Sequence, residues 1–165
     1  WGDHVGLLAF ADSVSRLVKP GSYPSSRLID ELSEVEARSV EPDYPRAMLT
    51  LSRELRRRSL IVVFTDVVDD EVSEPLAAHL ALLTRRHLPL LVAMRNSSLF
   101  AAASAPADGL DGAYRRAAAA ELVGARRTSL ERRRRAGVHV VDIEPDQSVT
   151  AAVDAYLDIK LRGRL

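Results

Sequence analysis

The stretch Leu60-Ile61-Val62-Val63-Phe64-Thr65-Asp66 decides the fold. Its first five residues are apolar, three of them β-branched and one aromatic, and the run stops sharply at a Thr-Asp pair. An uninterrupted apolar run of this kind is typical of a strand that is buried on both faces, as strands are in a parallel sheet. We therefore expect a central strand that ends at Thr65.

From Leu60 onward, segments with the pattern of strands alternate with segments that have the pattern of helices. This order predicts an α/β fold with a parallel sheet, right-handed crossovers and helices on both faces. Gly137 is expected to end the longest helix. The expected elements are helix 71–86, strand 88–94, a loop or a single loose turn over 101–108, helix 110–136, strand 138–143 and helix 149–161.

Upstream of Leu60, the sequence predicts an antiparallel hairpin followed by two helices. The apolar run 5–11 is the first strand, and the alternating segment 13–18 is an edge strand that ends before Pro20-Gly21. Helices are expected over 25–37 and 45–58. The first of these is expected to bury an apolar face made of Leu28, Ile29, Leu32 and Val35.

Composition limits the function classes. Lys plus Arg equals Asp plus Glu at 23 each, so no overall field attracts nucleic acid or anionic lipid. The chain has no Cys, which excludes disulfides and thiolate chemistry and fits a reducing compartment. No apolar run approaches the roughly 20 residues that a membrane-spanning helix needs. We therefore expect a soluble, cytoplasmic chain, and its opening Trp1-Gly2-Asp3 suggests a cut inside a larger protein.

The first candidate site follows the strand that ends at Thr65. In open parallel sheets, ligands bind outside the carboxyl ends of the strands, and Asp66 stands at such an end. One or two carboxylates with hydroxyl groups are sufficient protein ligands for Mg²⁺. We therefore predict a partner-binding surface, although Asp69 and Asp70 fit better as caps of the next helix. The predicted surface consists of Thr65, Asp66, Asp69 and Asp70.

The second candidate is a basic segment. Between residues 111 and 136, eight Arg stand against three acidic residues, which gives a local charge of +5. Such a segment is a solvated helix face, a partner surface or a nucleic-acid site, and the first is favoured because aromatic residues for base stacking are scarce. The basic residues are Arg115, Arg116, Arg126, Arg127 and Arg132, Arg133, Arg134, Arg135.

Established catalytic and metal-binding patterns are missing from the sequence. His4, His79, His87 and His139 lie in different predicted segments and show no ligand spacing. No nucleophile elbow, Walker loop or dinucleotide-binding glycine motif is present. We therefore expect no catalytic residue, and a binding module rather than an enzyme.

Four motifs, taken together in this order and spacing, resemble one family. It is the bacterial family of unknown function whose von Willebrand factor A-like domain is associated with MoxR-type AAA+ ATPases. The resemblance covers nearly the whole chain. The motifs are Gly2-Asp3-His4-Val5-Gly6-Leu7-Leu8-Ala9-Phe10, Glu41-Pro42-Asp43-Tyr44, the stretch 60–66 and Tyr156-Leu157-Asp158-Ile159-Lys160.

The resemblance implies a single, N-terminally truncated von Willebrand factor A-like domain over residues 1–165. Its three-layer fold has a mostly parallel sheet with one antiparallel edge hairpin, and it lacks the first strand and helix. The loss of that strand, which lies between strands 5–11 and 60–65 in the wider fold, leaves two open edges, so we expect self-association.

The wider fold also implies a metal site. Members bind a divalent metal through an Asp-x-Ser-x-Ser loop, a Thr in a second loop and an Asp at a strand end. Asp66 matches the last of these, and Asp43 lies where the Thr is expected. Because the first loop is absent, we expect no metal in this chain alone and Mg²⁺ in the complete domain, held in part by Asp66 and Asp43.

The function implied by the resemblance is protein binding with a MoxR-type AAA+ ATPase during the assembly or maturation of other proteins. The parent protein is then anchored at the inner face of the cell membrane. One alternative is a metal-dependent phosphoester hydrolase in which Asp66 and Asp43 hold the metal and Arg126 or Arg127 binds phosphate. A second alternative is nucleic-acid binding through the helix that carries Arg132 to Arg135.

Overall fold

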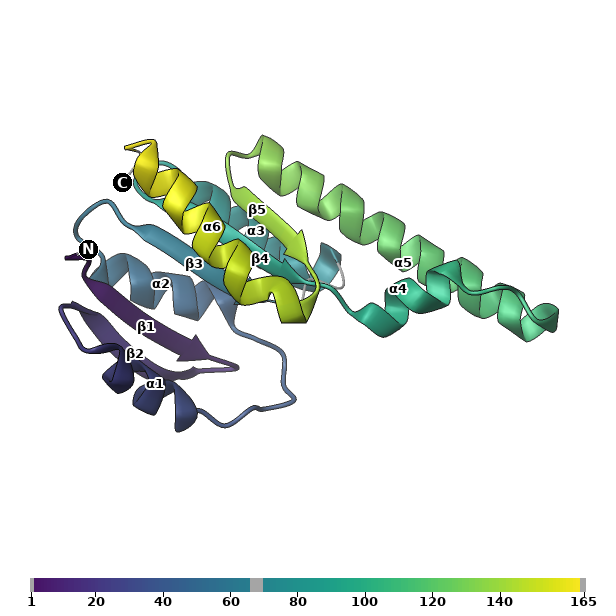
Figure 1. Ribbon diagram of the computed structural model, residues 1–165, viewed down its shortest axis with the longest axis horizontal. Helices are drawn as coiled ribbons and strands as arrows, with labels where there is room; N and C mark the ends of the chain where they lie inside the picture. Colours follow the sequence, from purple (N-terminus) through teal and green to yellow (C-terminus); the bar gives the residue numbers. More distant parts are fainter. Residues whose placement is uncertain (1, 66–69, 164–165) are drawn as a thin grey trace. The chain divides into compact units, whose positions relative to one another are not determined.

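The computed structural model describes residues 2–65 and 70–163, and their side chains except those of residues 70–74. The chain divides into two compact units, Trp1–Arg57 and Arg58–Leu165. The first contains a two-stranded antiparallel sheet, and the second contains a three-stranded parallel sheet with helices between its strands (Figure 1). The predicted α/β class with a parallel sheet and an antiparallel hairpin is confirmed, and it is consistent with a von Willebrand factor A-like fold. The hairpin forms a sheet of its own.

In the first unit, β1 (Val5–Phe10) pairs with β2 (Val14–Gly21). The prediction that Pro20 breaks the second strand is wrong, because β2 continues through it. The register shifts opposite Pro20, between Val5 and Leu7, and such irregularities tolerate a residue that lacks an N–H donor. Gly6 lies at this shift, and a Cβ there would be 2.8 Å from the Val18 carbonyl oxygen. The hairpin therefore depends on a glycine at this position.

Two helices follow the hairpin, α1 (Ser25–Ser33) and α2 (Tyr44–Glu54). The core forms around α2, where Tyr44, Ala47 and Met48 are buried and the Tyr44 ring packs edge-on against Phe10, with 5.7 Å between centroids. Asp43 caps α2 by accepting a hydrogen bond from the Arg46 N–H, at 2.9 Å. Pro45 lies in the first turn, as expected.

The predicted burial of the α1 apolar face is wrong. No α1 residue is buried, and Ile29 and Leu32 are 64% and 54% exposed. Leu28 of this face is half-buried, as is Glu31 one turn further along the helix. Glu31 and the C-cap residue Glu34 form ion pairs with Arg16 of β2. The side of α1 that lies against other residues is therefore mixed in character, and half of the predicted apolar face is left in solvent.

The second unit is built on β3 (Leu60–Thr65), β4 (Leu88–Met94) and β5 (His139–Ile143), which are parallel and lie in that order. Their predicted positions are confirmed to within a residue. Residues Leu90 to Ala93 of the middle strand are fully buried. This burial explains why β4 consists almost entirely of apolar residues.

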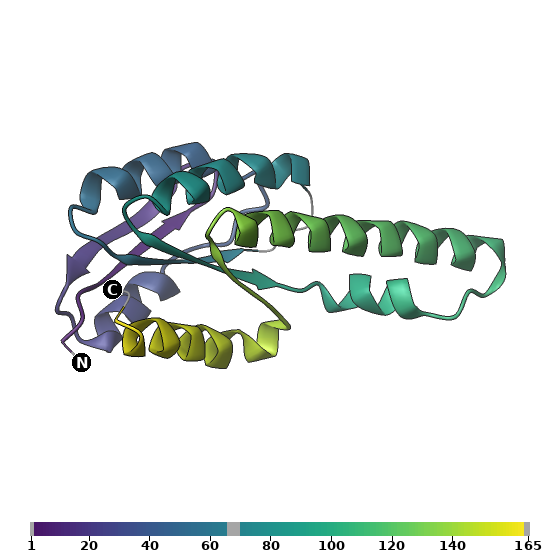
Figure 2. The same ribbon diagram turned by 90° about the horizontal axis from the view of Figure 1, so that it is seen from above.

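The helices of this unit are α3 (Asp70–Leu83), α4 (Ser97–Ser104), α5 (Gly109–Arg135) and α6 (Ser148–Leu161), with the short 3-10 helix η1 (Pro145–Gln147) before the last. In Figure 2, α3 and α5 lie on one side of the sheet and α6 on the other. Gly137 follows the end of α5 with a φ of 86°, as the prediction of a helix stop requires.

The predicted loop over 101–108 is wrong in its first half, because α4 covers 97–104. Asn96 starts this helix by accepting a hydrogen bond from the Leu99 N–H, at 3.2 Å. Ala101 to Ala103 continue it, since Ala has the highest helix propensity. The Ser and Pro residues that suggested a loop lie at the ends of the helix.

His87 lies between α3 and β4 and is only 4% exposed. Burial, with a smaller contribution from the nearby Arg86 charge, lowers the pKa of His87 below its ordinary value of 6.5. Below about pH 6.5, the unfolded chain therefore binds a proton at His87 more readily than the folded chain does, and the free energy of unfolding falls.

We predict that the free energy of unfolding, measured by urea titration, decreases between pH 7 and pH 5 and that His87→Gln flattens this decrease. His4→Gln is the matched control, because His4 is exposed. An unchanged pH profile in His87→Gln would contradict the role assigned to this side chain.

Candidate functional site at the carboxyl edge of the parallel sheet

Polar side chains gather where the strands of the second unit end. Arg95 follows β4 directly, Asp142 lies at the end of β5, and Glu144 follows that strand. Because parallel strands place their carboxyl ends at one edge of a sheet, these residues meet there together with Arg126 of α5. We call Arg95, Ser97, Arg126, Asp142 and Glu144 the carboxyl-edge cluster.

Arg126 forms the buried side of the cluster. Its side chain comes from α5, is 3% exposed, and donates to the Met94 carbonyl oxygen at 3.0 Å and to the Asp142 carboxylate at 3.1 Å. A charge at this depth is tolerated when it is both paired and hydrogen-bonded. Arg126 therefore joins α5 to the ends of β4 and β5.

Arg95 and Glu144 form the accessible side of the cluster. The Arg95 Nε donates to the same Asp142 carboxylate oxygen at 3.3 Å, and a second guanidinium nitrogen lies 4.0 Å from Glu144. Ser97 donates to Glu144 at 2.6 Å. The side chains of Arg95, Asp142 and Glu144 are 36%, 22% and 34% exposed. The cluster thus offers both signs of charge to solvent.

The chemistry of this arrangement suits recognition. The carboxylates accept from arginines and a serine hydroxyl, and the buried Arg126 holds the Asp142 carboxylate in place. Among the residues that the structure describes, no three His, Asp or Glu side chains come together as metal ligands. A partner with complementary charges would meet a preformed polar surface.

The sequence-predicted site lies partly outside the described residues. Thr65 ends β3, pairs with Ala93 of β4 and is half-buried, so the carboxyl end of β3 is at this same edge. Asp66 and Asp69 fall outside the described residues, and Asp70 begins α3 with a side chain that is also outside them. The predicted partner surface at these positions therefore stays a prediction.

The predicted solvated face of the basic helix is wrong for two of its residues. Arg126 belongs to the cluster, and Arg133 is 3% exposed and donates to the Ser129 hydroxyl. Arg134 forms an ion pair with Glu131. Some of the arginines between 126 and 135 are thus packed in the interior and others are solvated, because this half of α5 lies on the sheet.

Sequence reasoning missed Arg95, Asp142 and Glu144 as site residues. The signal that selected Asp66, a charged residue at the end of an apolar strand, also marks Arg95 after β4 and Asp142-Ile143-Glu144 around the end of β5. Applying it to all three strands would have found the cluster. The contribution of Arg126, in contrast, has no such local signal.

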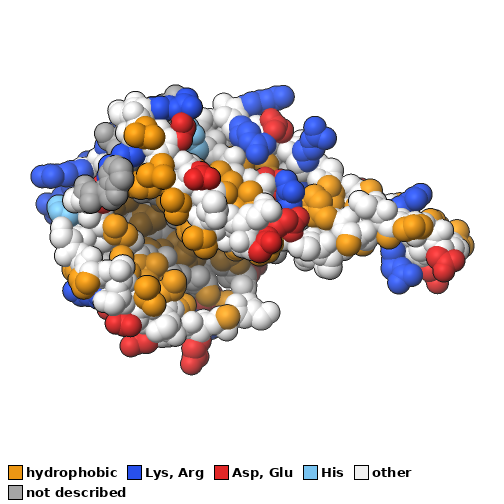
Figure 3. All heavy atoms as spheres, in the orientation of Figure 1, with side chains coloured by type: hydrophobic (Ala, Val, Ile, Leu, Met, Phe, Trp, Pro, Cys, Tyr) orange, Lys and Arg blue, Asp and Glu red, His pale blue; other side chains and the backbone are white. Residues whose placement is uncertain are grey.

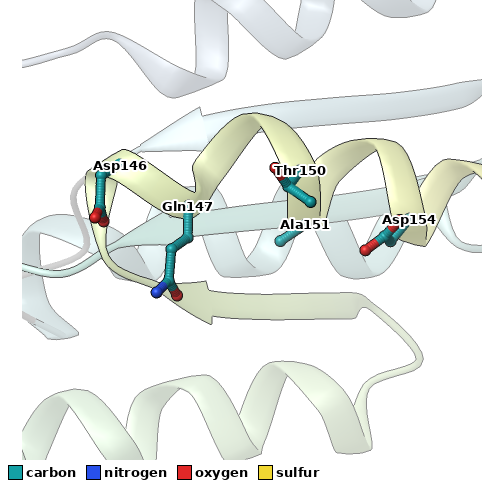
Figure 4. A pocket seen from close by; sticks show the side chains of 5 residues that line it. All are labelled: Asp146, Gln147, Thr150, Ala151 and Asp154. Atoms are coloured by element: carbon teal, nitrogen blue, oxygen red, sulfur yellow. The ribbon is translucent and has the colours of Figure 1, made fainter.

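An open surface depression lies on η1 and the first turns of α6 (Figure 4). Its lining residues are Asp146, Gln147, Thr150, Ala151 and Asp154. The carboxylates of Asp146 and Asp154 lie apart along the helix, and the Gln147 side chain points toward β5. These side chains therefore do not converge on one bound ligand.

Comparison with known proteins adds one finding. Residues 1–109 match the family model described as protein of unknown function DUF58. The chain belongs to this family. No curated protein and no solved structure matches the chain. The resemblance to a family of unknown function is thus confirmed, whereas its association with MoxR-type ATPases stays a prediction.

The match ends where α5 begins, so it includes Arg95 and Ser97 of the cluster, whereas Arg126, Asp142 and Glu144 lie beyond it. None of the described helices is both long enough and apolar enough to cross a bilayer.

The Arg126–Asp142 contact leads to a stability prediction. Asp142→Ala removes the carboxylate beside a buried guanidinium, so we expect the free energy of unfolding to fall by about 2–3 kcal/mol. Asp154→Ala, an exposed position on α6, is expected to change it by less than about 0.5 kcal/mol. Urea unfolding of both variants checks this, and equal losses would show that the contact contributes nothing.

Proposed function

We propose that this domain is a protein-binding module that acts with a MoxR-type AAA+ ATPase in the assembly or maturation of other proteins. The contact surface is the carboxyl edge of the parallel sheet. The observation that carries the proposal is the carboxyl-edge cluster, in which buried Arg126 supports the partly exposed Asp142, Arg95 and Glu144.

The arrangement of charges supports binding in particular. Charged groups that are already held in place lose little conformational entropy when a partner docks, and complementary charges speed association and select the partner. The cluster presents one guanidinium and two carboxylates within one edge. A partner surface with both signs of charge fits this pattern better than a uniformly charged polymer does.

The Thr65-Asp66 strand end belongs to the same proposal. The strand β3 ends with Thr65 at the same edge, and Asp66 follows Thr65 in the sequence. In the complete domain, Asp66 supplies a carboxylate to the partner or to Mg²⁺, whose preferred ligands are oxygen atoms. The parent protein then acts in the cytoplasm, at the inner face of the membrane.

Of the four residues named for a metal-dependent phosphoester hydrolase, the structure describes Asp43, Arg126 and Arg127. Asp43 caps α2, Arg126 is engaged by Asp142 and the Met94 carbonyl, and Arg127 is exposed. The other alternative is nucleic-acid binding through α5. Arg132 and Arg135 of this helix are exposed, but Arg133 is buried.

The proposal predicts which variants lose binding. In the complete parent protein, Asp66→Asn and Glu144→Gln are each expected to weaken binding to the purified MoxR-type ATPase of the same cell at least tenfold. The expected loss corresponds to removal of one charged contact, about 1.4 kcal/mol or more. Titration calorimetry with and without ATP measures the dissociation constant.

The matched control is Asp154→Asn, which neutralises an exposed carboxylate on α6 away from the edge. It is expected to bind as the unmodified protein does. Failure of the unmodified protein to bind the ATPase would remove this partner from the proposal, and equal binding by all three variants would remove the carboxyl edge as the contact surface.

A further inference from the structure

A helical hairpin extends from the second unit. It consists of α4 and the first half of α5, residues 97–123, and we call it the arm. Figures 1 and 2 show that it continues past the carboxyl ends of the strands. The helix α4 packs on α5, yet no residue of α4 is buried. Leu110 and Tyr114 of α5 are 74% and 70% exposed. Apolar and charged side chains are mixed on its surface (Figure 3).

The second half of α5 is held quite differently. It packs against β5 and α3, and it buries Arg126, Ser129, Leu130 and Arg133, whereas the first half of α5 buries Ala119 alone. Buried positions thus become frequent only after Gly124, where they make up four of the eight residues from 126 to 133. Motion of the arm would therefore concentrate in the short interval before Arg126.

Gly124 lies in that interval. It is exposed, and no other described part of the chain lies within 4 Å of the position that a Cβ would occupy. No close approach therefore requires a glycine, although glycine is the least favourable helix residue after proline. The Thr128 hydroxyl donates to the Gly124 carbonyl oxygen at 3.1 Å, and such bonds to the preceding turn often bend helices. Both features weaken the helix at one point.

The other connection into the arm is at Asn96. Pairing with β5 continues to Arg95, whose N–H donates to the Ile143 carbonyl oxygen at 2.8 Å. Asn96 follows with an extended backbone, and α4 starts at the next residue. Both chain segments that lead into the arm can thus bend next to the carboxyl edge of the sheet.

Two contacts hold α4 in its position at this edge. Ser97 donates to Glu144, and the Arg95 guanidinium lies 5.4 Å from the centre of the Phe100 ring. Contacts between partly exposed groups contribute little stability, so they favour one arm position and break readily. Both use side chains of the carboxyl-edge cluster.

We propose that the arm is a hinged element that pivots at Gly124 and Asn96, and that the Ser97–Glu144 and Arg95–Phe100 contacts form a latch for its resting position. A protein ligand that engages Glu144 or Arg95 opens the latch and frees the arm. This last step rests on the proposed function, whereas the hinge and the latch do not.

Double electron–electron resonance tests the hinge in the full chain without any partner. The chain lacks Cys, so Ala107→Cys at the arm tip and Thr150→Cys on α6 provide two unique labelling sites. We expect Gly124→Ala to narrow the distribution of label distances, because alanine stiffens the helix where it leaves the sheet. We expect Ser97→Ala to broaden it, because one of the two latch contacts, Ser97–Glu144, is lost.

Gly112→Ala is the matched control, since it makes the same change in the same helix but within the arm. A Cβ there would lie 3.5 Å from its nearest neighbour, an ordinary contact. Both glycine variants are expected to raise the Tm by about 2–4 °C, which confirms that they fold. Only Gly124→Ala is expected to narrow the distribution.

Hydrogen exchange gives an independent measurement. Amides of residues 121–127 are expected to exchange about fivefold more slowly in Gly124→Ala, with no such change in Gly112→Ala. An unchanged distance distribution in Gly124→Ala, or equal narrowing in both variants, would overturn the hinge. No broadening in Ser97→Ala would overturn the latch, and neither result bears on binding of the ATPase.

Discussion

The buried guanidinium of Arg126 is the interaction on which the second unit most depends. It bonds the Met94 carbonyl and the Asp142 carboxylate, and so joins α5, β4 and β5 at one point. A carbonyl at the end of a parallel strand needs a donor, and a buried cation needs an anion, so one side chain satisfies both requirements. The same contact orders Asp142 for Arg95 and thereby organises the carboxyl edge.

The carboxyl edge therefore combines stability and recognition. Arg126 is hidden, whereas Arg95 and Glu144 reach solvent from the two strands that it ties together. Charged groups fixed by buried partners bind with a smaller entropy loss than free side chains do. This is the physical basis for placing a protein contact here, in a family whose function is unknown.

The long helix α5 has two different environments along its length. Its second half carries the buried arginines, and its first half forms the exposed arm with α4. Gly124 separates the two where no neighbouring side chain requires its small size. A glycine that weakens the helix without improving the packing is understood as a point of motion. Gly124 lies two residues before the buried Arg126 and four before Thr128, which donates to its carbonyl oxygen.

The sequence by itself determined the α/β class, the three parallel strands and the edge at which ligands are expected, because apolar runs and helical periodicity are local properties of the chain. It also placed Asp66 at a strand end, which stays a prediction. Only the tertiary structure decided that Ile29 and Leu32 face solvent and that Arg126 is buried. The place of Arg126 depends on Asp142 and on the Met94 carbonyl, which are distant from it in the sequence, and no local pattern records such pairings.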